Sequence, residues 1–254
     1  MPLEVELVPA LSDNYAYLIR DAATGTVAVL DPAEADPVDA ALMARGWKPQ
    51  IILNTHHHGD HIGGNAALIE KYGCTLIGPA SEAHRIPNMD QTVRDGDRIK
   101  VGAEEALVFE TPGHTKGHIA FYFPGGPALF AGDTLFALGC GRMFEGTPEE
   151  FWSSLRKLRA LPDATRLYCG HEYTTSNARF ALSVDPANPD LVAQAAEVDR
   201  KRAQGLPTVP SLLGDAKRAN PFLRADDPAL SRHVGKPGDA IAAFAEIRRR
   251  KDTF

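Results

Sequence analysis

The chain has few cysteines, and none of them stands in a C-x-x-C spacing. Cys74, Cys140 and Cys169 make an odd count, which argues against a disulfide framework and a zinc ribbon. We expect reduced, partly buried thiols. The sequence also lacks an apolar run near the roughly 20 residues that cross a bilayer, and its start lacks the basic and apolar regions of a signal peptide. These absences predict a cytoplasmic protein with no membrane partner.

An excess of positive charge is absent as well. The 27 Lys and Arg residues are outnumbered by 33 Asp and Glu residues, so the formal net charge is −6. This balance disfavours nucleic acid as a partner. No repeat of fixed period and no low-complexity segment appears. The 254 residues, 44% hydrophobic and 24% charged, suit one large domain or one domain with a small appendage.

The first two thirds of the chain alternate short apolar runs with turn signals, which predicts a sheet-rich domain. A helix is expected over 37–44, closed by Gly46, and another over 65–72, capped by Asn65 and ended by Gly73. A third is expected after Thr147, where "TPEE" matches a capping box. The expected strands lie within 16–21, 27–32, 51–55, 75–79, 106–112, 119–126, 128–134 and 166–172.

Helical spacing dominates after about His171. The segments 175–184, 188–205 and 238–251 follow it, and Asn188-Pro189 and Gly205 mark the start and end of the second. No strand pattern of comparable quality appears there. We therefore predict an α+β domain over 1–172 followed by an all-α domain over 173–254.

The stretch "LNTHHHGDHIGG" crowds four histidines and an aspartate into six positions directly after the buried strand pattern "PQIILNT". In an extended chain, residues two apart point the same way, so His56 and His58 face one point and His57 faces the other side. Gly59 permits a turn that brings Asp60 and His61 to the same region. This spacing predicts a site for a borderline divalent metal.

Three further residues with metal-compatible side chains follow strand patterns, each with a glycine beside it. His114 lies in "TPGHTKGH", Asp133 in "LFAGDT" and His171 in "LYCGHE". Together with the histidine stretch they form a candidate ligand set of seven residues. His84 and His118 are expected at the surface or behind the ligands, Cys169 is not expected to be a ligand, and Asp31 is expected in a turn from which it can brace the histidine stretch.

The order His56, His58, Asp60, His61, His114, Asp133, His171 resembles the binuclear members of the metallo-β-lactamase superfamily. The segments "LSDNYAYLI", "GCGRMFEGT", "GHEYT", "PTVPS", "NPFLR" and "RRRKDTF" are similar to those of one branch, the glyoxalase II (hydroxyacylglutathione hydrolase) family. The resemblance implies an αββα sandwich with a C-terminal all-α domain. It also implies hydrolysis of S-D-lactoylglutathione to D-lactate and glutathione, the second step of methylglyoxal detoxification.

The same resemblance implies a division of the ligands. One metal is expected on His56, His58 and His114, and the other on Asp60, His61 and His171. Asp133 would bridge them, and Asp60 and Asp133 would act in catalysis through a metal-bound hydroxide. Two divalent ions are expected, zinc first, with iron or manganese as alternatives.

Substrate contacts are implied for residues near the metals and in the tail. Arg248 and Lys251 would grip the glycine carboxylate, and Arg142 and Tyr173 would contact the peptide or its cysteine end. Phe144 departs from members that carry a tyrosine here, so a hydroxyl contact is missing. Taken alone, "RRRK" is typical of a solvated helix terminus whose charges suit the helix dipole.

Two other activities of the superfamily stay open from the sequence. One is an iron-dependent dioxygenase acting on glutathione persulfide, which the complete second ligand set disfavours. The other is a phosphodiesterase or RNA nuclease, which the acidic balance disfavours. A non-catalytic binding role is disfavoured because all seven ligands are intact. We expect a monomer.

Overall fold

The computed structural model describes residues 3–254, which divide into two compact units. Unit 1 runs to Glu110 and includes Gly117–Gly132, and unit 2 consists of Thr111–Lys116 and Asp133–Phe254. Within the described residues, no helix combines the length and apolar character needed to span a membrane.

Unit 1 contains a sheet in the order β1-β2-β3-β4-β5-β6. Strands β1 to β3 pair antiparallel and β3 to β6 pair parallel. The strands are β1 (Leu3–Ala10), β2 (Asn14–Asp21), β3 (Val27–Leu30), β4 (Ile51–Leu53), β5 (Thr75–Pro79) and β6 (Gln91–Val93).

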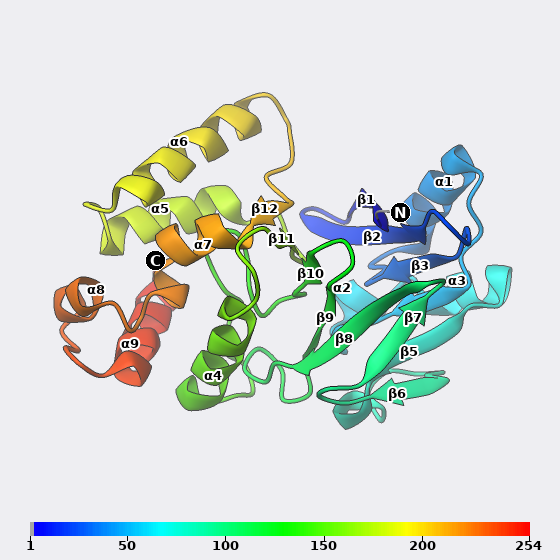
Figure 1. Cartoon of the computed structure of the whole chain (residues 1–254), viewed down its shortest axis with the longest axis horizontal. Coiled ribbons are helices and arrows are strands. Elements are labelled where there is room, and N and C mark those ends of the chain that lie inside the picture. The colour runs from blue at the N-terminus through cyan, green and yellow to red at the C-terminus, as the bar shows by residue number, and fades with distance from the viewer. Residues whose placement is uncertain (1–2) are drawn as a thin grey trace. The chain divides into compact units, whose positions relative to one another are not determined.

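Helices α1 (Ala35–Arg45) and α3 (Asn65–Tyr72) cover one face of this sheet (Figure 1). Val38 and Leu42 of α1 and Leu68 of α3 are buried in one cluster with Leu18 and Ile52 of the sheet. These helices form because their apolar residues return every three or four positions, and each ends at a glycine in the left-handed conformation.

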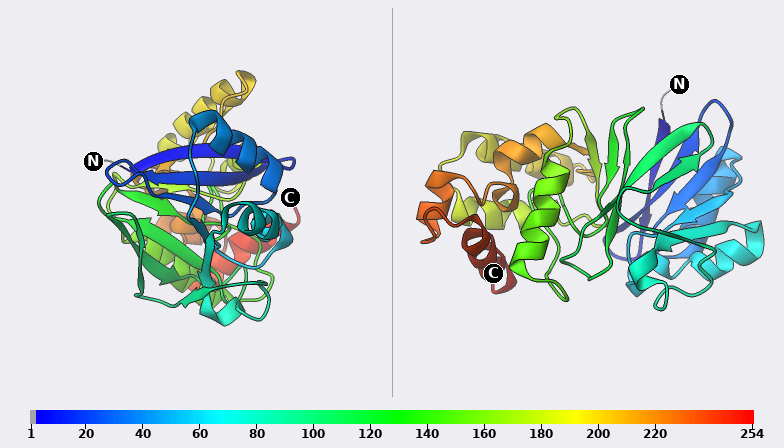
Figure 2. Two further views of the ribbon diagram at one scale, coloured as in Figure 1. Left: turned by 90° about the vertical axis from the view of Figure 1, so that its right-hand side faces the viewer. Right: turned by 60° about the horizontal axis from the view of Figure 1, so that its bottom comes forward.

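The other face of the sheet meets a second layer of antiparallel strands within unit 1, visible in Figure 2. Tyr17 of β2 contacts Phe130 of β10 edge to face, with ring centroids 5.5 Å apart. The two layers therefore enclose an apolar core between them. The strands of the second layer are β7 (Arg98–Val101), β8 (Glu104–Glu110), β9 (Ile119–Phe123) and β10 (Ala128–Phe130).

Unit 2 is mainly helical. Phe244 of α9 (Ala240–Asp252) packs against Phe151 and Trp152 of α4 (Pro148–Arg159), with ring centroids 5.5 and 6.2 Å apart. The remaining elements are β11 (Arg166–Tyr168), α5 (Thr174–Val184), α6 (Pro189–Ala203), β12 (Ser211–Leu212), α7 (Leu213–Ala219), η2 (Pro221–Leu223) and α8 (Pro228–His233).

Most predicted elements are confirmed, and the exceptions have local reasons. Thr147 and Glu150 form the predicted capping box, and Asn188 caps α6. The prediction that Asn65 caps α3 is wrong, because its side chain instead donates to Asn54 Oδ1 at 2.6 Å and Gly64 takes the cap position. The predicted all-α region after residue 172 is helical apart from the two-residue strand β12, which pairs with β11.

Candidate metal centre

The histidine stretch begins where β4 ends. His56 is fully buried, and its Nε2 lies 3.1 Å from Nδ1 of His58. His57 faces away and pairs its Nδ1 with Glu82 Oε2 at 2.8 Å. The predicted alternation is therefore confirmed. Convergence of two ring nitrogens of one strand end is the arrangement that a shared metal ion requires.

Asp31 braces this stretch from the end of β3. Its Oδ1 accepts from the Thr55 backbone N–H at 2.8 Å, and its Oδ2 accepts from the Thr55 hydroxyl at 2.6 Å. Oδ2 also lies 3.0 Å from Nδ1 of His61. Asp31 has a φ of 48°, a left-handed conformation that Asp tolerates better than most residues. The predicted bracing is confirmed and extends to a candidate ligand.

Asp60 and His61 lie in the short helix α2 (Gly59–Ile62) that follows the strand end. Asp60 Oδ2 lies 3.8 Å from His61 Nε2 and accepts from Asn14 Nδ2 at 3.1 Å. Because Asp31 engages Nδ1 of His61, Nε2 is the nitrogen directed toward Asp60. The turn expected at Gly59 is thus present as one helical turn.

Unit 2 brings its three candidate ligands together. Asp133 Oδ2 lies 3.4 Å from Nε2 of His114 and 3.3 Å from Nε2 of His171. All three residues are at most 6% exposed. One carboxylate oxygen therefore lies within 3.4 Å of two imidazole nitrogens, and both atom types are ones that divalent metals bind.

These distances and donor types fit a metal. Zinc–nitrogen bonds of about 2.1 Å in tetrahedral geometry put neighbouring ligand atoms about 3.4 Å apart. His114 Nδ1 donates to the Arg142 carbonyl at 2.8 Å, which leaves the lone pair on Nε2, and Asp31 does the same for His61. The chain therefore carries histidine and aspartate groups that are able to bind metal.

Two family models match consecutive parts of the chain. The metallo-beta-lactamase superfamily model matches residues 11–171, and the model described as hydroxyacylglutathione hydrolase C-terminus matches residues 172–254. A protein of Ruegeria pomeroyi named hydroxyacylglutathione hydrolase is 55% identical over 100% of both chains. This chain belongs to the hydroxyacylglutathione hydrolase family.

Solved structures share the fold. The structure of ETHE1 from Myxococcus xanthus has a TM-score of 0.71 at 26% identity and covers 98% of this chain and 90% of its own. TTHA1623 in a di-iron-bound form has a TM-score of 0.61 at 26% identity, with 85% and 98% covered. The predicted metallo-β-lactamase fold with a helical hydroxyacylglutathione hydrolase C-terminus is confirmed.

The residues that family resemblance implies as substrate contacts differ in exposure. Arg142 is exposed, Phe144 is 60% exposed and Tyr173 is 39% exposed. The Phe144 ring lies 5.3 Å from that of His114, and the Tyr173 ring stacks on that of His171 at 4.6 Å. Two exposed aromatic rings therefore flank the ligands of unit 2.

The two tail residues have other partners. Arg248 is only 4% exposed and donates to backbone carbonyls of Cys140 and Gly141. Lys251 Nζ donates to Ser176, and burial, followed by the charge of Arg248, lowers the pKa of Lys251 to about 8. At neutral pH Lys251 is therefore still a cation.

Glu82, which the sequence did not indicate, and His118 also contact the histidine stretch. Glu82 holds His57 through one carboxylate oxygen and accepts from the Gly117 backbone N–H at 3.1 Å through the other. His118 is fully buried and stacks on His56, with ring centroids 4.9 Å apart, whereas His84 is exposed. Glu82 gave no sequence signal because its partners lie 25 and 35 positions away.

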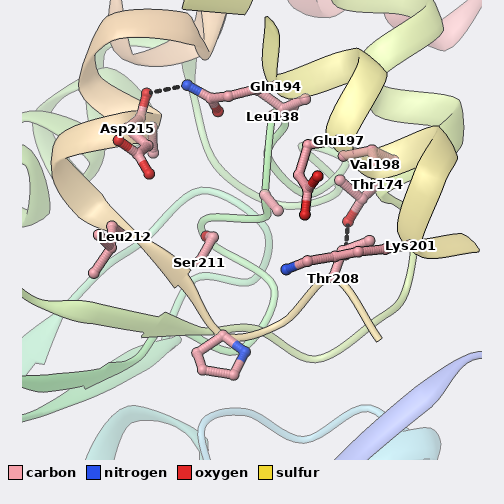
Figure 3. Close-up of a pocket in the computed structure, with 13 residues that line it drawn as sticks. Leu138, Thr174, Gln194, Glu197, Val198, Lys201, Thr208, Ser211, Leu212 and Asp215 are labelled. Carbon is pink, nitrogen blue, oxygen red and sulfur yellow. Dashed lines mark hydrogen bonds between the residues drawn. The ribbon is translucent and has the colours of Figure 1, made fainter. Parts of the chain in front are cut away.

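Unit 2 also contains a pocket whose lining includes Ala137, Leu138 and Thr174, which lie close in the sequence to Asp133 and Tyr173. Side chains of α6, β12 and α7 line it, among them Glu197, Lys201, Ser211 and Asp215 (Figure 3). None of the predicted site residues is among its lining residues in the described part of the chain.

Proposed function

We propose that this chain hydrolyses the thioester of S-D-lactoylglutathione to D-lactate and glutathione. The observation that carries the proposal is the Asp133 carboxylate placed between the two Nε2 atoms of His114 and His171. Its support is the family membership of the whole chain. The same reaction places the chain at the second step of methylglyoxal detoxification.

We propose two divalent metal ions as cofactors. His56, His58 and His114 would hold one, Asp60, His61 and His171 would hold the other, and Asp133 would contact both. Zinc is the proposed occupant, and iron and manganese suit the same donors. When bound, such ions lower the pKa of a coordinated water to about 7 and so supply a nucleophile at neutral pH.

The protein's own groups orient this chemistry. The Arg142 carbonyl and Asp31 fix the Nδ1–H forms of His114 and His61 and direct each Nε2 lone pair. The leaving group is a thiolate whose conjugate acid has a pKa of about 8.5, so its departure needs no general acid. This agrees with a site built from histidine and carboxylate ligands.

Substrate contacts are proposed around the exposed rings. Tyr173 and Phe144 would bind the peptide beside the ligands, and Arg142 and Lys251 would pair with carboxylates of glutathione. A contact of Arg248 with the glycine carboxylate stays a prediction. We propose a monomer in the cytoplasm, without membrane or nucleic-acid partners.

The proposal is tested with the Asp133→Ala variant. Loss of the shared carboxylate is expected to abolish thiol release from S-D-lactoylglutathione and to lower the metal content, because both histidine partners lose a common ligand. Thiol release is followed with a thiol reagent, and metal is quantified in the same sample. Asp199→Ala, which changes an exposed aspartate of α6, is the matched control.

Near-normal turnover by Asp133→Ala with full metal content would reject the site. Oxygen uptake with glutathione persulfide, or aryl phosphodiester hydrolysis, at rates above thioester hydrolysis by the unmodified enzyme would reject the reaction.

A further inference from the structure

The loop that follows Asp133 is buried but has almost no regular structure. Residues 136–141 are all buried, and Phe136 and Gly139 form an isolated antiparallel bridge. We call residues 136–142 the ligand loop. Buried backbone carbonyls outside helices and sheets require donors from elsewhere. The ligand loop therefore depends on side chains for its shape.

Helical segments of unit 2 provide these donors. Asn220 Nδ2 donates to Phe136 O and Gly139 O, at 3.3 and 2.9 Å. Asn177 Nδ2 donates to Ala137 O at 3.2 Å. The two carbonyls that precede Arg142, those of Cys140 and Gly141, accept from a charged group instead.

That charged group is the guanidinium of Arg248. Its Nη1 donates to Cys140 O at 3.0 Å and to Gly141 O at 3.3 Å. Its Nε and Nη2 donate to Asp252 Oδ1 at 3.1 and 2.8 Å, and the guanidinium carbon lies 5.2 Å from the centre of the Phe222 ring. A buried charge with this many partners is costly to remove, because its acceptors are then left unpaired.

The end of the ligand loop touches two candidate ligands directly. The Arg142 carbonyl accepts from His114 Nδ1 at 2.8 Å. A Cβ atom on Gly141 would lie 2.0 Å from Asp133 O and 3.0 Å from His114 Nδ1, so the loop backbone leaves no gap there. A shift of Cys140 and Gly141 is therefore transmitted to His114 and Asp133.

We propose that Arg248 is a positioning residue for the metal ligands. By clamping the carbonyls of Cys140 and Gly141, it holds the ligand loop so that the Arg142 carbonyl orients His114 against Asp133. This role rests on the proposed metal centre and differs from a direct contact with substrate. It explains why a tail arginine is buried while its neighbour Arg249 is 66% exposed.

Cys140 provides a readout that needs no substrate. Its side chain is 4% exposed, its Sγ lies 3.7 Å from Arg248 Nη1, and burial raises the pKa of its thiol to about 11. Cys74 is also buried, but it lies in unit 1, where its Sγ donates to Pro49 O at 3.6 Å. Labelling of Cys140 and Cys74 by a thiol reagent, resolved by peptide mass, therefore reports the order of the ligand loop against an internal reference in unit 1.

The experiment uses the full-length, metal-loaded chain with Arg248→Ala, Arg248→Lys and the control Arg249→Ala. We expect Arg248→Ala to raise the labelling rate of Cys140 at least about tenfold, with the labelling rate of Cys74 unchanged. Zinc affinity, from competition with a chelator, should fall about 10- to 100-fold, as for other residues that orient metal ligands. Arg248→Lys should have a Cys140 labelling rate and a zinc affinity between those of Arg248→Ala and the unmodified chain, because an ammonium lacks the planar fork of the guanidinium. Arg249→Ala should match the unmodified chain in both measurements.

The proposal is overturned if Arg248→Ala raises KM alone and leaves Cys140 labelling and zinc affinity unchanged. If Arg248→Ala does not fold, Arg248→Lys decides: unchanged labelling and zinc affinity overturn the proposal, and an increase in labelling with weaker zinc binding supports it. Labelling and zinc affinity are measured without substrate. A failure of the proposed thioester hydrolysis would therefore show in the unmodified enzyme and not in these two measurements.

Discussion

Asp31 and Glu82 are two buried carboxylates that each engage the Nδ1 atom of a histidine in the same short stretch. Asp31 engages His61, a candidate ligand, and Glu82 engages His57, which faces away from the candidate ligands. Both carboxylates also accept from a backbone N–H of this stretch. A comparison of the two carboxylates therefore distinguishes a residue that supports the backbone alone from one that also orients a candidate metal ligand.

We expect Asp31→Asn to weaken metal binding about 10- to 100-fold, since the amide no longer strengthens or orients His61 as a ligand. Glu82→Gln should leave metal affinity within about twofold, because His57 is not a proposed ligand. Chelator competition on both variants measures this difference, and thermal unfolding of the metal-free forms shows whether they remain equally folded. Equal metal affinities in the two variants would contradict the assignment of His61.

The candidate ligands could be predicted from the sequence because each follows a strand pattern and has glycine nearby. The period of two along a strand was enough to set His57 apart from His56 and His58. The burial of Arg248 could not be predicted, because "RRRK" has the same letters whether a helix end is solvated or packed. Its acceptors lie more than 100 positions earlier in the chain.

Helix ends were predictable where the signal is local. The Thr147 hydroxyl accepts from the Glu150 backbone N–H at 3.3 Å, and the Glu150 carboxylate accepts from the Thr147 N–H at 2.8 Å. Asn65 is also a residue type that often caps helices, but its side chain donates to Asn54 Oδ1 instead. Asn54 lies in another segment, and a local sequence pattern does not show such a contact. The two-residue strand β12 is too short to form a pattern at all.

We expect Thr147→Ala to destabilise the protein by about 1 kcal/mol, because the capping hydroxyl is lost. For a chain of this size such a loss lowers Tm by about 2–4 °C. Ser153→Ala changes an exposed residue of the same helix and should stay within about 0.5 kcal/mol. Denaturant unfolding of both variants measures the difference, and equal stabilities would show that the capping box contributes nothing measurable to α4.

At the scale of the whole molecule, the sequence pattern changes from strands to helices near residue 172. The main part of unit 2 begins earlier, at Asp133. Unit 2 already includes α4, whose Phe151 and Trp152 pack on Phe244. Arg159 of α4 also donates to Leu223 O at 2.6 Å. A pattern along the sequence reports local structure, whereas a shared core depends on contacts across about 90 residues. The predicted boundary at 172/173 can be tested directly on this core.

We expect a fragment of residues 173–254 to lack a cooperative thermal transition, because α9 is then separated from α4. Phe244 is fully buried, and exposing a side chain of this kind costs about 1.5–3 kcal/mol. A fragment of residues 133–254 restores α4 and should regain helicity and a measurable transition. Circular dichroism at matched concentration compares the two. If the 173–254 fragment unfolds cooperatively without α4, residues 173–254 form an independent domain. The packing of Phe244 on α4 would then be dispensable for the folding of that domain.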